Sequence, residues 1–343
     1  MRKILAILIL FSNLFAAQDR ILRFNPDGEF RILQFTDIHW SNDPKFTNKT
    51  EETLRTLMKK EKPDLIVLTG DNVTCIPMKS GWQNLGKVIE EAGVPWTLVF
   101  GNHDEEQDWS KTQSFEFLKT LPHFVGEKGN VRGVINYSMP VFQHAGNVPG
   151  AYLYFLDSGD YTRDPKLGSY DWIHRDQVQR YAEESRRHKS RDNRVLPSVM
   201  FFHIPLQEYT EVMKDPATVG DKNEGVSSSK VNSGLFAAIL EQKDVMATFC
   251  GHDHDNNFIG VEKGIALAYG SKSGNDSYGG LEQGARVIIL KENQFAFDSY
   301  ISYKSGKKYD YSYPAGLSKV DAGTKVLKSL NVSPKAYGLE YRY

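Results

Sequence analysis

The chain has 343 residues, with 42 basic and 43 acidic side chains and a formal net charge of −1. This balance excludes a bulk electrostatic field that would attract nucleic acid, and no nucleic-acid polymer is expected as a partner. The 17 tyrosines and 19 phenylalanines are typical of a folded protein. A chain of this length can form one large domain that buries about three quarters of its unfolded surface.

Residues 1–17 have the pattern of a secretion signal. Two basic residues precede an apolar run over residues 4–11, and the small residues Ala16 and Ala17 follow. The run is too short to span a bilayer as a stable anchor. We expect an exported protein, periplasmic or extracellular, with no stable membrane anchor after signal cleavage. An uncleaved segment that tethers the protein is the alternative.

The chain contains two cysteines, Cys75 and Cys250. They could form one bridge, but a large domain does not need a disulfide in order to fold. We favour two free, partly buried thiols.

Strands alternate with helices over the first hundred residues. Apolar segments at 31–36, 65–68 and 96–100 predict buried strands, and helical spacing at 50–60 and 82–91 predicts the helices between them. Right-handed crossovers make such strands parallel, so their carboxyl ends are expected at one edge of a sheet.

The second half of the chain continues this alternation, with a less regular spacing. The predicted strands are residues 134–138, 151–156, 199–202 and 245–249, and the predicted helices are residues 114–119, 176–189 and 232–242. Residues 215–229 are polar and are expected to form a surface loop or a lid. Residues 286–290 and 295–302 are predicted to be antiparallel strands that complete a second sheet.

No linker divides the chain, so the sequence predicts one domain, a two-sheet α/β sandwich with helices outside. It would extend over residues 18–343, with a core that carries the motifs at 31–302 and a tail at 303–343.

Residues that can bind metal or move protons follow five of the predicted strands. They are Asp37-Ile38-His39, Gly70-Asp71, Gly101-Asn102-His103-Asp104, His203 and Gly251-His252-Asp253-His254. Carboxylate oxygen and neutral imidazole nitrogen are the donors that divalent ions prefer. Each motif alone has an ordinary explanation as a turn or a core residue, but their repetition after five strands favours one metal site. The remaining histidines (His123, His144, His174 and His188) are expected to be surface residues.

These motifs resemble those of the calcineurin-like metallophosphoesterases, whose pattern is D-x-H, G-D, G-N-H-[DE], a single H and G-H-x-H. The surrounding sequence is most similar to the purple acid phosphatase 28/29-like branch. True purple enzymes have a tyrosine ligand three residues after the bridging aspartate, and Thr74 stands at that position here. We therefore expect no purple colour. The resemblance implies a four-layer α/β/β/α sandwich of two mixed sheets flanked by helices.

The resemblance also implies a ligand set for two metal ions. One ion is assigned to Asp37, His39 and His254, the other to Asn102, His203 and His252, and Asp71 bridges them. Such a centre hydrolyses phosphomonoesters or phosphodiesters by attack of a metal-bound hydroxide. The donors suit Zn, Fe or Mn equally well.

Two further site residues follow from the resemblance. His103 would stabilise the phosphoryl charge and protonate the leaving oxygen, and Asp104 would orient His103.

Several alternatives stay open at this stage. The substrate is expected to be a small-molecule phosphoester, but the chain could act on cyclic nucleotides, nucleotides or phospholipid headgroups. It could also be a metal-binding protein of the same fold without catalysis. Trp40, Tyr209 and Asn257 are candidates for the lining of the substrate pocket. The sequence does not predict an oligomeric state.

Overall fold

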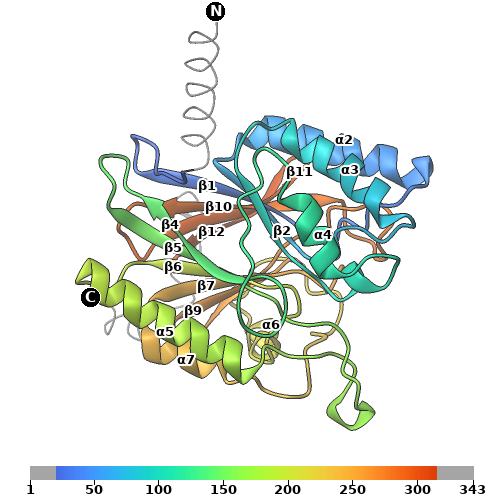
Figure 1. Ribbon diagram of the computed structural model, residues 1–343. Coiled ribbons are helices and arrows are strands. Elements are labelled where there is room, and N and C mark those ends of the chain that lie inside the picture. The colour runs from blue at the N-terminus through green and yellow to red at the C-terminus, as the bar shows by residue number, and fades with distance from the viewer. Residues whose placement is uncertain (1–20, 315–343) are drawn as a thin grey trace, which may run out of the picture.

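The computed structural model describes residues 21–314, and within them two six-stranded sheets pack face to face (Figure 1). The first sheet has the strand order β12 (Lys307–Tyr313), β11 (Phe297–Tyr303), β10 (Gly284–Lys291), β1 (Glu29–Phe35), β2 (Leu65–Thr69), β3 (Trp96–Val99). The second has the order β4 (Asn136–Phe142), β5 (Pro149–Leu156), β6 (Ser198–Phe201), β7 (Val245–Cys250), β9 (Ile265–Tyr269), β8 (Ile259–Glu262).

Helices cover the outer face of each sheet (Figure 1). The first sheet is covered by α2 (Pro44–Glu61), α3 (Met78–Glu90) and α4 (Lys111–Leu118). The second is covered by α5 (Arg175–Asp192), α6 (Tyr209–Lys214) and α7 (Leu235–Gln242). Two short 3₁₀ turns, η1 (His103–Glu105) and η2 (Pro165–Leu167), lie in loops. The predicted four-layer α/β/β/α sandwich is confirmed.

The core between the sheets follows from the alternation of side chains along each strand. On β5, Leu153 and Phe155 belong to the cluster that joins the two sheets, whereas Tyr152 and Tyr154 point to the other face. On that second face, Tyr154 packs edge-on against Tyr181 of α5. Both faces of β5 are therefore covered, which explains why residues 150–156 are all buried and carry almost only apolar or aromatic side chains.

The parallel β1-β2-β3 unit is as predicted, but two later strands lie in a different sheet from the one expected. β10 pairs antiparallel with β1, from Glu29 opposite Lys291 to Gln34 opposite Arg286, and β11 pairs with β10. These strands therefore extend the first sheet and do not complete the second. An unforeseen hairpin, β8-β9, completes the second sheet by pairing with β7. The alternation of apolar and polar residues predicts that a segment is a strand. It does not indicate which strand pairs with it, and here the partner is more than 250 residues away.

The loop at 215–229 lies at the surface as predicted, and it is tied to the segment that follows β7. The Asn223 N–H donates to the Asp255 carbonyl, and the Ser227 N–H donates to the Asp253 carboxylate. These bonds hold the loop against the protein.

Both cysteines are buried free thiols, as favoured from the sequence. Among residues 21–314, no helix combines the length and the apolar character that a bilayer crossing requires. The predicted signal at 1–17 and the end of the predicted tail lie outside the described residues.

Candidate metal centre

The carboxyl ends of strands from both sheets meet at one place in the sandwich. Asp37 follows β1, Asp71 follows β2 and Asn102 follows β3, while His203 and His252 follow β6 and β7 of the second sheet. Open α/β sheets carry their ligand sites at such strand ends.

The side chains gathered there form two groups that could each hold a metal ion. The first group is Asp37, His39, Asp71 and His254, and the second is Asp71, His203 and His252. Within each group the possible ligand atoms all lie within 4.8 Å of one another. Asp71 belongs to both, which is the arrangement that a bridging carboxylate requires. Asn102 lies close to the shared carboxylate, because the N–H of the next residue, His103, donates to Asp71 Oδ1 over 2.9 Å.

Several polar atoms in these groups are buried without a hydrogen-bond partner. They include Nε2 of His39, Nε2 of His252 and Oδ1 of Asn102. A buried polar atom that lacks a partner costs about 1–3 kcal/mol, and native proteins seldom keep several in one place. The amide of Asn102 is oriented by its own Nδ2, which donates to the Tyr161 hydroxyl over 2.8 Å and leaves Oδ1 free. The residues present therefore fit a pair of metal ions.

The backbone of these segments adopts a conformation that side chains disfavour. The φ angle is +50° at Asp37, +43° at His39, +50° at Asp71 and +83° at His252. Residues other than glycine seldom occupy this left-handed region, and outliers of this kind concentrate at functional sites. Backbone hydrogen bonds hold the segments in place: the Asp37 N–H donates to the Gly70 carbonyl and the His39 N–H to the Asp71 carbonyl.

Three glycines in the motifs allow the strand ends to approach this closely. A Cβ on Gly101 would overlap Asp71, one on Gly70 would overlap the His203 ring, and one on Gly251 would overlap Thr36. Only glycine fits where two backbones or a backbone and a ring are in direct contact. The pattern of a strand, a glycine and a ligand therefore has a steric cause.

The sequence profile of the calcineurin-like phosphoesterases matches residues 30–256, a span that contains all nine predicted site residues. The chain belongs to the calcineurin-like phosphoesterase family. It is 32% identical to the "probable inactive purple acid phosphatase 29" of Arabidopsis thaliana, over 89% of this chain and 88% of that protein. It is 30% identical to "Phosphatase DCR2" of Saccharomyces cerevisiae, over 80% of this chain and 53% of that protein.

A solved structure shows the same fold at low identity. A dimetal phosphatase from Danio rerio superposes with a TM-score of 0.56 at 11% identity, over 82% of this chain and 98% of that chain. This likeness supports the arrangement of the layers and not the details of the site.

Within this calcineurin-like phosphoesterase, the structure corrects the role expected of Asp104. Its carboxylate is fully buried and accepts hydrogen bonds from the backbone of Gly101, Asn72 and Val73, and from the Asn72 side chain. It fastens the segment after β2 to the segment after β3, so it positions Asp71 and does not orient His103.

His103 is oriented by a different carboxylate, that of Glu106. The His103 Nδ1 lies 2.5 Å from Glu106 Oε2, and its Nε2 lies 4.0 Å from Asp71 Oδ2. The side chain of His103 is 35% exposed, so its ring lies at the mouth of the site with Nε2 turned towards the shared carboxylate. The sequence could have indicated this pair, because His103 and Glu106 are three residues apart and such residues are neighbours on a helical turn.

The charges at the centre are coupled to one another. Burial alone would lower the pKa of His203, but the Asp71 carboxylate, 3.1 Å from Nε2, outweighs it and raises the pKa to about 9. Burial would raise the pKa of Asp71, and His203 holds it well below its usual range. Burial lowers the pKa of His252 to about 3, with the charge of His203 acting in the same direction. In the metal-free family member, an ion pair between Asp71 and His203 thus lies beside a neutral His252.

Three residues expected to line the pocket are core residues. Trp40, Tyr209 and Asn257 are each at most 1% exposed, and the Tyr209 hydroxyl is hydrogen-bonded to Thr248. The aromatic side chains that do border the ligand groups are those of Tyr161, Tyr170 and Tyr278. They lie in irregular loops, where no periodicity in the sequence indicates which way a side chain points.

The other histidines stay out of both ligand groups, and each pairs with a carboxylate or a tyrosine. His123 pairs with Glu90, His144 with Glu292 and His174 with Asp171. His188 stacks on Tyr152. His144 is exposed, as expected, while the other three are half-buried.

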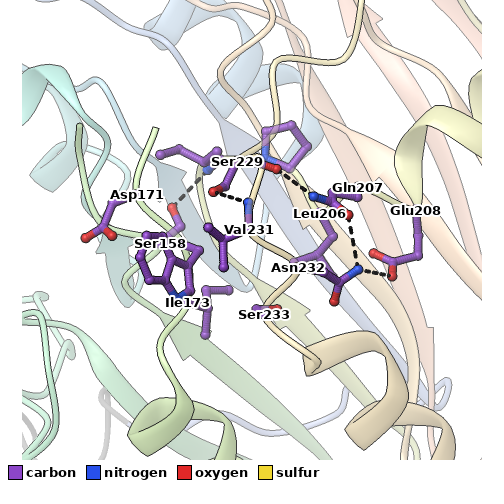
Figure 2. Close-up of a pocket in the computed structure, with 13 residues that line it drawn as sticks. Ser158, Asp171, Ile173, Leu206, Gln207, Glu208, Ser229, Val231, Asn232 and Ser233 are labelled. Atoms are coloured by element: carbon purple, nitrogen blue, oxygen red, sulfur yellow. Dashed lines mark hydrogen bonds between the residues drawn. The ribbon is translucent and has the colours of Figure 1, made fainter. Parts of the chain in front are cut away.

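A separate pocket is lined in part by the residues that directly follow His203, from Ile204 to Glu208, and Figure 2 shows its lining. Its polar side chains are engaged with their neighbours: the Gln207 amide donates to the Ser229 carbonyl, and the Asn232 amide donates to Gln207 and Glu208. The pocket contains none of the candidate metal ligands, and it lacks the unpartnered atoms of the strand-end site.

Proposed function

We propose that this chain is a dinuclear metal-dependent phosphoesterase that hydrolyses small-molecule phosphomonoesters or phosphodiesters. One observation carries the proposal: Asp71 belongs to two groups of ligand atoms, and those groups contain buried polar atoms that have no hydrogen-bond partner within the protein. A single bridging carboxylate between two N/O ligand sets is what a two-metal hydrolase needs.

The residues would divide the work as follows. Asp37, His39 and His254 would hold one metal ion, and His203, His252 and Asn102 would hold the other, with Asp71 between them. Bound metals supply Lewis-acid activation of the phosphoryl group and of a water molecule. The neutral Asn102 oxygen limits the total ligand charge, and its orientation is set by the Tyr161 hydroxyl. Zn, Fe and Mn all suit this mixed donor set.

His103 would supply a proton to the leaving oxygen. Its Nε2 faces Asp71 while its Nδ1 is held by Glu106, so the ring is fixed in one direction. A general acid must lie within reach of the departing atom, and positioned acids of this kind contribute roughly 10²–10⁴-fold to the rate.

The plant relative is named as probably inactive. The present chain retains every ligand of the pattern, with buried imidazoles that suit bound metal, and it also retains His103, the residue proposed to move the proton. This combination supports activity in the present protein, and a metal-binding protein without catalysis is the competing outcome of the test.

The test is elemental analysis of the purified protein, followed by turnover of p-nitrophenyl phosphate and bis-p-nitrophenyl phosphate with each metal restored. The two substrates separate monoester from diester preference. His103→Ala should keep its metal content and lose about a hundredfold in turnover. His144→Ala removes an exposed histidine outside both ligand groups and is the matched control. A metal-loaded protein that is inert towards a broad phosphoester panel would contradict the proposal.

We also propose that the protein is exported, on the pattern of residues 1–17. Amino-terminal sequencing of protein recovered outside the cytoplasm should find the chain cut after Ala17. Recovery of the intact amino terminus in the cytoplasm would exclude export.

A further inference from the structure

Exposed aromatic surface borders the candidate metal centre. Six large apolar or aromatic side chains are more than a third exposed among residues 21–314. Two of them, Tyr161 at 42% and Tyr278 at 57%, touch candidate metal ligands. Aromatic faces left open to water beside a catalytic centre are available for stacking with a ligand.

Tyr161 and Tyr170 form a wall on the side of the second ligand group. The two residues pair across an antiparallel bridge, and their rings stack with centroids 5.8 Å apart at 28°. The Tyr170 ring meets His252 edge-on at 4.4 Å, and the Tyr161 ring lies 6.3 Å from that of His103. The wall therefore borders both the metal-binding side chains and the proposed proton donor.

Tyr278 forms a second aromatic surface on the side of the first ligand group. Its ring stacks on His254 at 4.0 Å and 21°, and its hydroxyl donates to Glu224 over 2.8 Å. The buried Lys272 fastens the Tyr278 loop, because its Nζ donates to the carbonyls of Tyr278 and Gly279. Tyr278 is therefore exposed but held in place, and one face of its ring rests on His254.

We propose that these tyrosines bind a flat aromatic ring carried by the leaving group of the substrate. The inference rests on the proposed phosphoesterase function and specifies its substrate class. A phosphoryl group at the two ligand groups would place its ester substituent between or beside the tyrosine surfaces. Flat rings stack on such surfaces, and aromatic pairs contribute about 0.5–1.5 kcal/mol beyond the burial of area. A saturated substituent of equal size gains the burial but not the stacking.

Two kinds of ester share this chemistry: aryl phosphates, whose ring is attached directly to the ester oxygen, and nucleotides, whose base lies farther from the phosphorus. The probes are non-hydrolysable phosphonates, since their affinity does not depend on the quality of a leaving group. Benzylphosphonate and cyclohexylmethylphosphonate form a matched flat and saturated pair. The methylene phosphonate analogue of adenosine monophosphate tests the nucleotide arm, and inorganic phosphate tests the metal centre alone.

Calorimetric titration of the metal-loaded full chain measures each affinity. Benzylphosphonate should bind roughly fivefold more tightly than its saturated partner, a ratio that corresponds to about 1 kcal/mol. Tyr278→Leu and Tyr161→Leu should bring this ratio towards one. Tyr278→Phe, which keeps the ring, should retain it, and so should Val148→Ala, which alters an exposed apolar side chain outside both ligand groups.

The outcomes separate the two proposals. A nucleotide analogue that binds more tightly than inorganic phosphate, an advantage lost in the leucine variants, identifies a nucleotide ester when benzylphosphonate shows no advantage over its saturated partner. A preference for benzylphosphonate identifies an aryl ester. The inference is overturned, and the phosphoesterase proposal left standing, if phosphate binds, the flat and saturated phosphonates bind with equal affinity, and the nucleotide analogue binds no more tightly than phosphate. Failure of the metal-loaded protein to bind phosphate or any phosphonate removes both.

Discussion

The two candidate ligand groups share Asp71 but are built by different means. In the first group, Asp37, His39 and Asp71 all have positive φ angles, and backbone hydrogen bonds hold them there. In the second group, His203 has no exposed surface, and its Nδ1 donates to the Thr69 carbonyl over 2.7 Å. The first group has left-handed backbone at three of its four members, and the second combines such backbone, at Asp71 and His252, with close packing around the His203 imidazole.

This difference shows that one site can combine two ways of placing a ligand. Strained backbone aims short side chains in directions that ordinary strand ends do not reach. Tight packing fixes a longer side chain, because Gly70 and Gly101 leave the His203 ring a space with no spare volume. Substitution of a ligand should therefore reduce metal binding in either group. In the second group, added volume in a neighbouring residue should also be destabilising.

The largest expected effect comes from the residue that the groups share. Asp71→Asn removes the charge that would bridge two ions, so both metals should be lost and turnover should fall by roughly a thousandfold or more. By contrast, His39→Gln and His252→Gln should each reduce the metal content by about half, because each belongs to one group. Elemental analysis with turnover measures both effects. Glu116→Gln, which breaks an exposed pair with Lys119 on α4, is the control.

Two bound metals in Asp71→Asn would show that the carboxylate does not bridge. Equal metal loss in all three variants would show that the two groups bind metal as one cooperative site and not as two separate ones.

The next effect tests packing in the second group. Gly101→Ala adds one methyl group that overlaps Asp71 and also approaches the His203 ring. Overpacking of this kind costs about 1–3 kcal/mol, and we expect the upper end because the neighbours are backbone and a buried ring. Gly225→Ala is the matched control, since its Cβ would meet nothing within 4 Å. Thermal unfolding of the metal-free proteins measures the difference, and equal midpoints for the two variants would contradict the packing argument.

Much of the site was predictable because its motifs are local. Each motif consists of a few consecutive residues at the end of a buried strand, and most have a glycine directly before the ligand. Parallel strands bring such ends together. Six of the seven predicted ligands accordingly lie in the two groups, and Asn102 directly precedes His103, whose N–H donates to Asp71. The left-handed angles at Asp37 and Asp71 were not predictable, because they depend on contacts between β1 and β2 that only the folded chain makes.

The errors concern side-chain direction and distant partners. Asp104 lies within the short η1 turn and Glu106 directly follows it, and the geometry of that turn sends the Asp104 carboxylate into the core and the Glu106 carboxylate to His103. Tyr161 and Tyr278 lie in loops without a repeating pattern, so nothing in the sequence placed them at the site. The pairing of β10 with β1 joins segments from opposite ends of the chain, and a wrong sheet was assigned because alternation carries no information about partners.

The smallest expected effect concerns the charge on the second group in the metal-free protein. The pKa of His203 is about 9, above its ordinary value of 6.5, so the folded state binds this proton more tightly than the unfolded state. The resulting stabilisation is fully present below pH 6.5 and is lost as the pH rises through 9. The free energy of unfolding of the metal-free protein should therefore fall by about 2 kcal/mol between pH 6.5 and 8.5. Urea unfolding in the presence of a chelator measures it, and His203→Gln should flatten this slope. If the free energy of unfolding of His203→Gln depends on pH as strongly as that of the unsubstituted protein, another group titrates. The Asp71–His203 ion pair then does not stabilise the metal-free protein.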